Sequence, residues 1–242
     1  MNERIRRLAL VAVTLIVALV VATTYWQAWA AGDLAARQDN AVKRVAQFRV
    51  KRGLIYAANG TVLATNRPRR IAGQTFYLRR YPQGKLAAAV VGYSTQARFR
   101  AGLERSLNDY LTGSNANLET VLDTALDRLT GGTIEGNSLV LTLRPHAQRV
   151  AQEALGRACG AAVALEPATG RVLVMATSPT YDPNLVERDF RQIARATADC
   201  SPAAPLLNRA TAGLYAPGST FKLVTAAAAL DSGAFRPETT FL

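Results

Sequence analysis

Histidine and cysteine are scarce in this chain: His146 is the only histidine, and Cys159 and Cys200 are the only cysteines. No C-x-x-C pair and no cluster of histidine with cysteine occurs, and tightly bound transition metals need such clusters. We therefore predict neither a metal site nor a cofactor. A Ser-His-Asp triad would have to use His146, whose place at the start of a predicted helix indicates an ordinary histidine instead.

The two cysteines leave two possibilities open. If this part of the chain lies outside the cytoplasm, its oxidising environment permits a disulfide, and the two residues are far enough apart in sequence to close a loop. We predict a bridge between Cys159 and Cys200, with two isolated thiols as the alternative.

Acidic residues are scarce in the first part of the chain. Residues 1–110 carry a net charge of +13 and residues 111–242 a net charge of −1. Such an excess of lysine and arginine raises nucleic acid as a partner, but the sequence has no zinc-ligand spacing and no aromatic string typical of RNA-binding modules. We therefore predict no nucleic-acid partner, and interpret the excess as an arginine-rich surface beside a membrane, where anionic lipids and polymers attract it.

Charge is absent altogether from Leu8 to Trp26. As a helix this run spans about 28 Å, close to the hydrocarbon thickness of a bilayer. Three arginines precede it, and the next basic residue is Arg37. The positive-inside rule then predicts a single pass through the cytoplasmic membrane, with the N-terminus inside and the bulk of the chain outside.

A cleaved signal peptide is the alternative to this anchor. Ala28-Trp29-Ala30 has the small-x-small form of a cleavage site. The apolar run is longer, however, than the usual signal core of about 7–15 residues. We therefore favour an uncleaved anchor.

Two segments have the pattern of β-hairpins. In Arg52–Ala64, alternating apolar residues flank Asn59-Gly60, which is a strong short hairpin signal. In Ala161–Ser178, two apolar runs flank a turn at residues 167–170. Because both runs of the second hairpin are continuously apolar, we expect both of its faces to be covered, at the centre of a sheet with helices packed on it.

Helical spacing of apolar residues, bounded by asparagine, proline or glycine, predicts further helices. A charged amphipathic stalk is expected over Asp33–Val50, a short strand over Leu139–Leu143, and loops with short helices over Pro179–Pro217. The predicted helices are Gly102–Gly113, Asn117–Leu129 and His146–Ala158.

Ser219 and Lys222 form an S-x-x-K motif behind the turn Pro217-Gly218, at the start of a helix predicted to run to about Asp231. A turn followed by a helix places residues i and i+3 on one face, so the serine hydroxyl and the lysine amine can meet. A serine needs a nearby base to attack a carbonyl. We expect a dry, apolar helix to favour the neutral amine that takes up the proton, which is the chemistry of penicillin-recognising acyl transferases.

Several stretches in their order along the chain together resemble the class B penicillin-binding proteins, most closely the actinobacterial penicillin-binding protein A type. The resemblance extends over nearly the whole chain from Arg52 onward. The stretches that carry it are Arg52-Gly53-Leu54-Ile55, Asn59-Gly60, Leu63-Ala64, Arg80-Tyr81-Pro82, Gly102-Leu103-Glu104, the hairpin Ala161–Ser178, Tyr181-Asp182-Pro183-Asn184, Asn208-Arg209-Ala210-Thr211, and Ala216-Pro217-Gly218-Ser219-Thr220-Phe221-Lys222.

The resemblance implies an α+β protein in four parts. These are a cytoplasmic stub (1–7), a single transmembrane helix as anchor (8–29), an extended or mixed non-catalytic pedestal (30–139), and the start of a serine β-lactamase-like α/β transpeptidase domain (140–242). The change of charge near residue 140 agrees with the last boundary.

The resemblance also implies a D,D-transpeptidase that cross-links peptidoglycan in cell-wall synthesis and division. Ser219 would be the nucleophile, with its own N–H contributing to the oxyanion hole, and Lys222 the base. The implied partners are stem peptides ending in D-Ala-D-Ala, β-lactams that acylate the same serine, the cytoplasmic membrane, and a membrane glycan polymerase.

The sequence departs from the family pattern in two ways. Ala57-Ala58 stand where an acidic residue usually precedes the Asn-Gly turn. The twenty residues after Lys222 contain neither the S-x-N nor the K-[TS]-G motif expected there. We therefore expect the 242 residues to be an N-terminal part of the enzyme that is inactive by itself.

Other functions remain open as alternatives. One is a β-lactam sensor or a non-catalytic membrane scaffold of the cell-wall machinery; a sensor should lack the pedestal-like segment Arg52–Gly113, which favours the enzyme. A β-lactamase or a D,D-carboxypeptidase would not explain a long region between anchor and nucleophile. Asp182 and Glu187 are possible carboxylate bases, which we interpret as ordinary surface charges.

Overall fold

The computed structural model describes residues 2–29, 45, 47–114 and 135–240. Most of the predicted stalk and the predicted helix Asn117–Leu129 lie outside the described residues.

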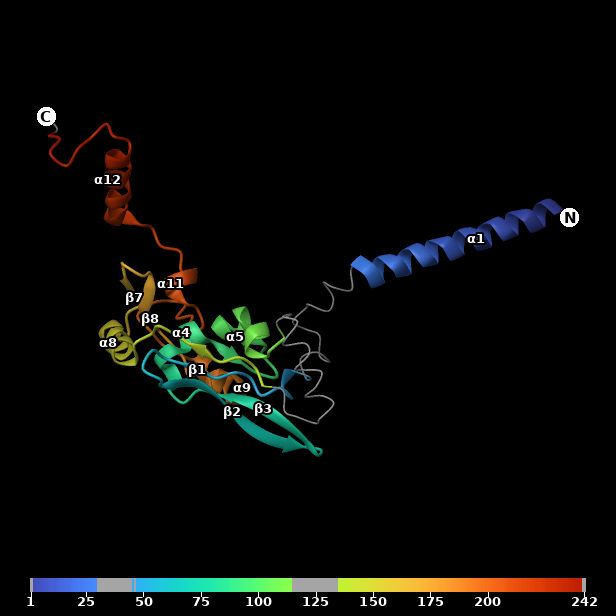
Figure 1. Cartoon of the computed structure of the whole chain (residues 1–242), viewed down its shortest axis with the longest axis horizontal. Helices are drawn as coiled ribbons and strands as arrows, with labels where there is room; N and C mark the ends of the chain where they lie inside the picture. Colours follow the sequence, from blue (N-terminus) through green and yellow to red (C-terminus); the bar gives the residue numbers. More distant parts are fainter. Residues whose placement is uncertain (1, 30–44, 46, 115–134, 241–242) are drawn as a thin grey trace.

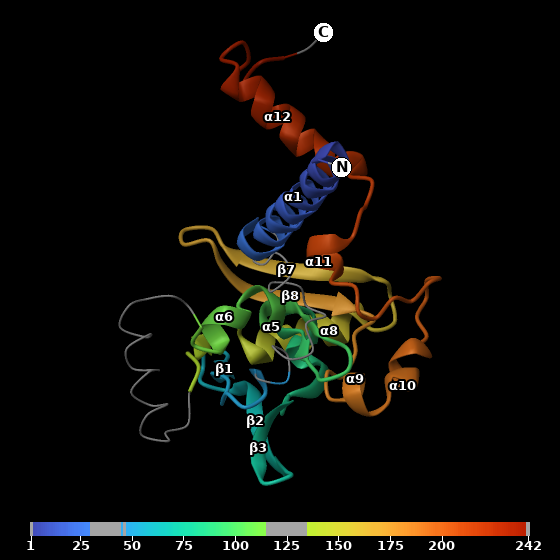
Figure 2. The same ribbon diagram turned by 90° about the vertical axis from the view of Figure 1, so that its right-hand side faces the viewer.

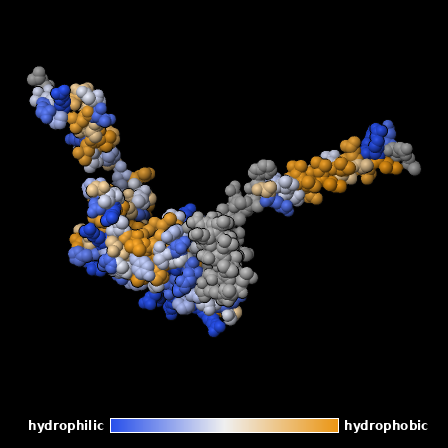
Figure 3. Space-filling model, viewed as in Figure 1, coloured by the Kyte–Doolittle hydropathy of each residue, from blue (hydrophilic) through white to orange (hydrophobic). Residues whose placement is uncertain are grey.

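The N-terminal apolar run forms helix α1 (Asn2–Thr24), followed by a π-helical turn over Tyr25–Trp29. The residues Glu3–Ala28 are long and apolar enough to cross a membrane, and none of this helix is buried against the rest of the chain. Figure 3 shows the apolar side chains as a nearly continuous orange rod. The predicted apolar helix is confirmed; the same features fit a membrane anchor or a signal sequence.

The first sheet has the strand order β3-β2-β1-β6. Strands β1 and β2 form the hairpin predicted at Asn59-Gly60, where the Thr61 N–H donates to Asn59 Oδ1 over 3.1 Å. Strand β6 lies parallel to β1, and the other neighbours are antiparallel. The strands are β1 (Ile55–Tyr56), β2 (Val62–Ile71), β3 (Gln74–Arg80) and β6 (Leu139–Val140).

The long β2–β3 hairpin extends away from the body of the molecule (Figures 1 and 2). Pro68 lies opposite Tyr77, and the Tyr77 N–H points outward to the carbonyl of Phe48, at 2.7 Å. The Pro68–Tyr77 pair is therefore a non-hydrogen-bonded pair, where proline's missing N–H removes no bond to β3.

Short elements cover this sheet. The predicted helix Gly102–Gly113 is present as two turns that break at Leu107. The elements between β3 and β6 are η2 (Gly84–Ala87), α4 (Ala88–Val91), β4 (Tyr93–Ser94), β5 (Arg100–Ala101), α5 (Gly102–Ser106) and α6 (Asn108–Leu111).

The second hairpin is confirmed as β7 (Gly160–Glu166) and β8 (Arg171–Ser178), preceded by α8 (Pro145–Leu155), which has Pro145 in its first turn. Helix α8 packs against β8. The expectation that both faces are covered is wrong for β7: Val163 and Leu165 are 47% and 57% exposed. Within the described chain no element buries the face of β7 that carries Val163 and Leu165.

The segment after β8 is mostly loop with short helices, as predicted. It ends in a single turn and one longer helix that extends from the body (Figure 2). These elements are α9 (Leu185–Arg188), α10 (Phe190–Ala194), α11 (Arg209–Ala212), η3 (Gly218–Thr220) and α12 (Phe221–Asp231).

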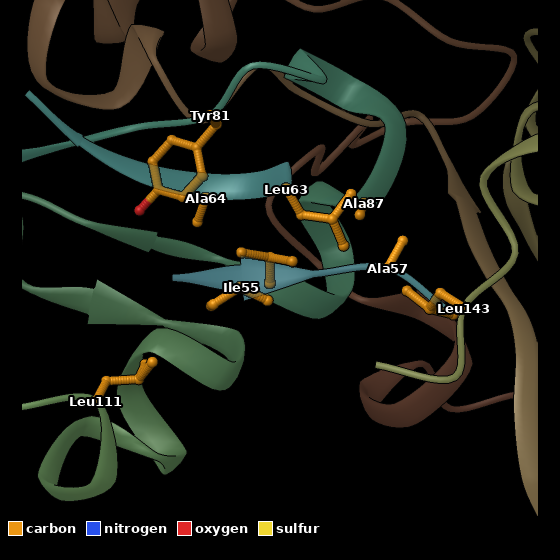
Figure 4. Packing of buried hydrophobic residues seen from close by; sticks show 9 residues of the cluster. Ile55, Ala57, Leu63, Ala64, Tyr81, Ala87, Leu111 and Leu143 are labelled. Atoms are coloured by element: carbon orange, nitrogen blue, oxygen red, sulfur yellow. The ribbon is translucent and has the colours of Figure 1, made fainter. Parts of the chain in front are cut away.

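The hydrophobic core lies around β1 (Figure 4). Ile55 and Leu111 are fully buried there, and Leu143 packs into the same cluster from the far side of the predicted boundary at residue 140. Ala57 is also fully buried. A carboxylate at position 57 would lose its hydration inside the core, so an alanine is more favourable there than an acidic residue.

The stretch from Leu139 to Arg144 connects the four-stranded sheet to the β7–β8 sheet. The Leu141 N–H donates to the Tyr56 carbonyl (2.8 Å), and the Arg144 N–H donates to the Leu173 carbonyl (2.9 Å). The boundary at residue 140 falls within this stretch and remains a prediction.

A charged cluster is buried beside the core. Glu104 accepts hydrogen bonds from Arg52 Nε at 3.1 Å and from Arg79 Nε at 2.6 Å, and all three side chains are at most 2% exposed. Burial lowers the pKa of Arg52, although Glu104 acts in the opposite direction. The expectation that the N-terminal arginines form a surface is therefore wrong for Arg52 and Arg79, which are internal counter-charges of Glu104.

The predicted disulfide is confirmed. Cys159 and Cys200 are bonded, with their Cα atoms 5.9 Å apart. Beside the bridge, the Asp199 N–H donates to the Arg157 carbonyl at 3.1 Å, and Arg157 Nε lies 3.3 Å from the Asp199 carboxylate. The bridge joins the start of β7 to the loop after α10.

Candidate active site

The predicted turn and helix around Ser219 are both observed. Ser219 is the middle residue of η3, and Lys222 is the second residue of α12, which continues η3 directly. The two residues are three positions apart in continuous helical backbone, which places them on one face. Gly218 has φ +52, a left-handed conformation that glycine adopts without a side-chain penalty. This glycine lets the chain turn sharply into the helix.

The turn is held by local hydrogen bonds. The N–H and the hydroxyl of Thr220 both donate to the Pro217 carbonyl, the N–H over 3.2 Å. At the other end Gly233, with φ +71, follows the helix, where the predicted stop lies. The helix is therefore bounded by the two features that the sequence predicts.

The expectation of a dry pocket around the motif is wrong for the described chain. No residue of α12 is buried, and Phe221 and Leu223 next to the motif are 54% and 76% exposed. Among the described residues, neither the Ser219 hydroxyl nor the Lys222 amine has a hydrogen-bond partner. Most residues of this helix are apolar, and no described element buries any of them.

The segment before the motif is anchored by two side chains whose role the sequence did not reveal. Asn208 caps α11 by accepting the Ala210 N–H at 3.1 Å, and its Nδ2 donates to the Ala89 carbonyl at 3.0 Å. The Arg209 guanidinium is buried and donates to the Ala203 carbonyl at 2.7 Å. An asparagine directly before a short helix is a capping signal, but its bond to α4 depends on the tertiary fold.

The other candidate residues are engaged elsewhere. Asp182 Oδ1 accepts from the Asn184 N–H at 2.9 Å, and Glu187 Oε2 accepts from the Gln96 N–H at 2.8 Å. His146 is exposed on α8. No described hydrogen bond joins any of these side chains to Ser219. Within the described ranges, no three His, Cys, Asp or Glu side chains are grouped so as to hold a metal ion.

Two family models match the chain. Residues 52–139 match the penicillin binding protein A dimerisation domain, and residues 160–242 match the penicillin binding protein transpeptidase domain. The first region contains the four-stranded sheet except the end of β6, and the second contains the β7–β8 hairpin and the S-x-x-K motif. The combination defines a penicillin-binding protein.

Curated relatives and solved structures narrow this class. The chain is 38% identical to the peptidoglycan D,D-transpeptidase PbpA of Mycolicibacterium smegmatis, over 99% of this chain and 49% of the relative. It is 35% identical to PbpA of Mycobacterium tuberculosis, over 98% of this chain and 49% of the relative. The chain thus spans about half the length of these relatives.

The fold agrees with solved structures of the same type. The imipenem acyl-enzyme complex of penicillin-binding protein A from M. tuberculosis superposes with a TM-score of 0.66 at 33% identity, covering 79% of this chain and 45% of that chain. The crystal structure of PBPA from M. tuberculosis gives a TM-score of 0.65 at 32% identity, covering 80% and 48%. The chain belongs to the PbpA-type penicillin-binding proteins, of which it contains the dimerisation domain and part of the transpeptidase domain.

Proposed function

We propose that this chain belongs to a peptidoglycan D,D-transpeptidase that forms a serine acyl-enzyme, with Ser219 as nucleophile and Lys222 as its base. The observation that carries the proposal is the placement of the two residues one helical turn apart, behind the Pro217-Gly218 turn, within the region that matches the transpeptidase domain. The relatives named above supply the reaction class.

In this reaction the Ser219 Oγ attacks the carbonyl carbon of the penultimate D-alanine of a stem peptide, and its proton moves to the Lys222 amine. The peptide bond breaks, and the departing D-alanine takes that proton on its nitrogen. An ester to Ser219 remains. An amine from a neighbouring strand then attacks the ester, which forms the cross-link and returns a proton to the serine.

A β-lactam would acylate the same serine and leave a slowly hydrolysed ester. Solved relatives are described as acyl-enzyme complexes of imipenem and penicillin G. We propose β-lactams and D-Ala-D-Ala stem peptides as ligands of this protein on that basis.

We further propose that α1 anchors the protein in the cytoplasmic membrane, with its arginine-flanked N-terminus inside and the domains outside. The length and apolar surface of the helix support an anchor. A membrane glycan polymerase is the proposed partner of the region 52–139, by its family resemblance. Co-purification of that polymerase should decrease when residues 52–113 are replaced by an unrelated domain.

Labelling with a fluorescent penicillin tests the nucleophile in the longest polypeptide that carries this sequence. Ser219→Ala should abolish labelling, and Lys222→Ala should slow it by about 10²–10⁴-fold, the usual effect of a general base. Ser232→Ala is the matched control, since Ser232 follows the same helix and donates to the Ala229 carbonyl at 2.6 Å. Labelling that persists in Ser219→Ala, with the mass of the acyl group on another residue, would refute the proposal.

A further inference from the structure

A cavity of about 640 Å³ lies between the β2–β3 hairpin and the segment at 182–188. It is far along the chain from the S-x-x-K motif and contains neither of its residues. Five of its lining residues are arginines: Arg79, which is paired with Glu104, and Arg67, Arg69, Arg80 and Arg188. The apolar part of its wall includes Phe48, Leu78 and Pro82.

The strand register explains why three of these arginines meet. In β2, Arg67 and Arg69 are two positions apart and therefore point to the same face. Arg80 lies opposite Thr65 on that face, diagonal to Arg67. The next arginine in the strand, Arg70, points to the opposite face and does not line the cavity.

Four of these arginines have no counter-charge within the described residues. Among those residues, no carboxylate lies within salt-bridge distance of Arg67, Arg69, Arg80 or Arg188. The two carboxylates in the cavity wall, Asp182 and Glu187, already accept hydrogen bonds from backbone N–H groups. Five arginines against these two carboxylates leave the cavity wall with a net positive charge, which favours an anionic ligand.

A buried hydroxyl in the wall is also without a partner. Ser94 is 4% exposed and lines the cavity, and its Oγ makes no hydrogen bond among the described residues. The backbone N–H of Ser94 donates to the Tyr81 hydroxyl at 2.7 Å, which fixes the residue in place. A buried polar atom left unpaired costs free energy unless a ligand or water satisfies it.

The spacing of the charges favours an extended peptide. Strand residues rise about 3.3 Å each, so Arg67 and Arg69 are roughly 7 Å apart along β2. An extended peptide repeats its side chains on one side at the same interval. Guanidinium groups can bind planar carboxylates in a bidentate manner, and Arg79 in the cavity wall already donates to the Glu104 carboxylate, from its Nε at 2.6 Å. A flat lipid surface would not enter a cavity that the segment 182–188 closes on its far side.

We propose that this cavity binds an acidic peptide segment of a partner protein, in extended conformation, with carboxylates at alternating positions against Arg67 and Arg69. The hairpin supplies the charges, and the apolar wall receives the side of the peptide that faces Leu78. This binding involves no acylation, so it is measured independently of Ser219.

Fluorescence anisotropy with the full 242-residue chain in detergent micelles tests the proposal. The probe is a labelled heptapeptide with glutamate at alternating positions, compared with the same peptide carrying glutamine. We expect the glutamate peptide to bind more tightly and Arg67→Gln with Arg69→Gln to weaken it about tenfold, the effect of two partly exposed ion pairs. Ser94→Ala should weaken it about threefold without lowering the unfolding temperature.

Arg70→Gln is the matched control, because Arg70 is an exposed arginine on the other face of the same strand. It should leave the affinity within about twofold. Equal binding of the two peptides, or an equal loss in Arg70→Gln, would overturn the proposal in favour of non-specific charge attraction. Displacement of the peptide by inorganic phosphate at equal concentration would indicate a single-anion site. Loss of binding to phosphatidylglycerol vesicles in parallel with the peptide would indicate a membrane-facing surface instead.

Discussion

Asn184 pairs with the backbone of Tyr81 as a neighbouring strand would. Its Oδ1 accepts the Tyr81 N–H at 3.0 Å, and its Nδ2 donates to the Tyr81 carbonyl at 2.9 Å. Asp182 Oδ1 accepts a third hydrogen bond from Nδ2, at 2.7 Å, which fixes the orientation of the amide. The two residues are 103 positions apart, so a single carboxamide joins the region of the dimerisation domain to that of the transpeptidase domain.

Asn184→Ala should lower the free energy of unfolding by about 2 kcal/mol, since it removes two hydrogen bonds of about 1 kcal/mol each and leaves a part-buried backbone pair unsatisfied. Urea denaturation followed by circular dichroism measures the change. Gln74→Ala, at the exposed tip of the β2–β3 hairpin, is the control and should have no measurable effect. If both variants unfold at the same urea concentration as the unmodified chain, the amide does not stabilise the contact.

Glu104 should be the most sensitive single polar residue in the fold. Glu104→Gln removes the counter-charge of Arg52 and Arg79, which remain buried and cationic. Breaking one partner of a buried ion pair costs about 3–5 kcal/mol. We expect a loss in that range by urea denaturation, with the secondary structure retained at low temperature.

Glu135→Gln is the matched control for Glu104→Gln. Glu135 lies 2.7 Å from Lys51, but these side chains are 62% and 45% exposed. Solvent and salt screen such a pair, so the variant should be almost as stable as the unmodified chain. Equal destabilisation by the two substitutions would contradict the argument from burial.

The local elements of the fold could be predicted because their signals are local. Asn59-Gly60 specifies a hairpin through turn geometry, and Pro145 begins a helix because its missing N–H is not needed there. The single predicted helix at 102–113 is broken at Leu107, where packing over the sheet prevails over periodicity.

The burial of the charges and the exposure of helix α12 could not be predicted. Arg52 and Glu104 are 52 positions apart, and an arginine in sequence has no mark that distinguishes an internal ion pair from a solvated surface. The apolar pattern of α12 predicts burial, but a pattern does not say which element provides the cover. The spacing of Ser219 and Lys222 could be predicted from the sequence because it is itself the requirement of the proposed chemistry, and their catalytic roles stay a prediction.

Tyr81 should make the protein less stable in alkali. Burial, with a further contribution from Glu104, raises the pKa of Tyr81 well above its usual value of 10.0. Above about pH 10 the unfolded chain loses this phenolic proton while the folded chain keeps it. The protonated Tyr81 side chain therefore contributes fully to the free energy of unfolding below pH 10, and this contribution is lost as the pH rises above that value.

Urea denaturation at several pH values between about pH 9 and about pH 11 measures how steeply the free energy of unfolding decreases with pH. In Tyr81→Phe the slope should decrease, since the titrating group is gone. Spectrophotometric titration gives an independent measurement: the phenolate absorbance of Tyr81 should be missing until the protein unfolds. Burial also raises the pKa of Tyr181, so two of the eight tyrosines should be silent in the folded state. Full ionisation of all tyrosines before unfolding would contradict the burial.

The disulfide should contribute to stability through the loop that it closes. Its two cysteines are 41 positions apart, and for a loop of that length the loss is about 2–4 kcal/mol when both are replaced by serine. Denaturation of the Cys159→Ser, Cys200→Ser double variant measures this loss. Asp199→Asn, beside the bridge, should have little effect because its ion pair with Arg157 is exposed. Two titratable thiols in the denatured, unreduced protein would show that the bridge does not form.

The exposure of α12 should determine how the 242-residue chain reacts with penicillin. In this chain the Ser219 residue is exposed to water, and in the proposed mechanism its own N–H would be the one oxyanion donor that the motif supplies. Each missing oxyanion donor slows acyl transfer by about 10²–10³-fold. We therefore expect labelling of Ser219 to be at least about 10²-fold slower in the 242-residue chain than in the longest polypeptide that carries it. Ser219→Ala in the same chain gives the background, and circular dichroism confirms that the chain is folded. Equal labelling rates in the two polypeptides would show that the described residues already form a complete site.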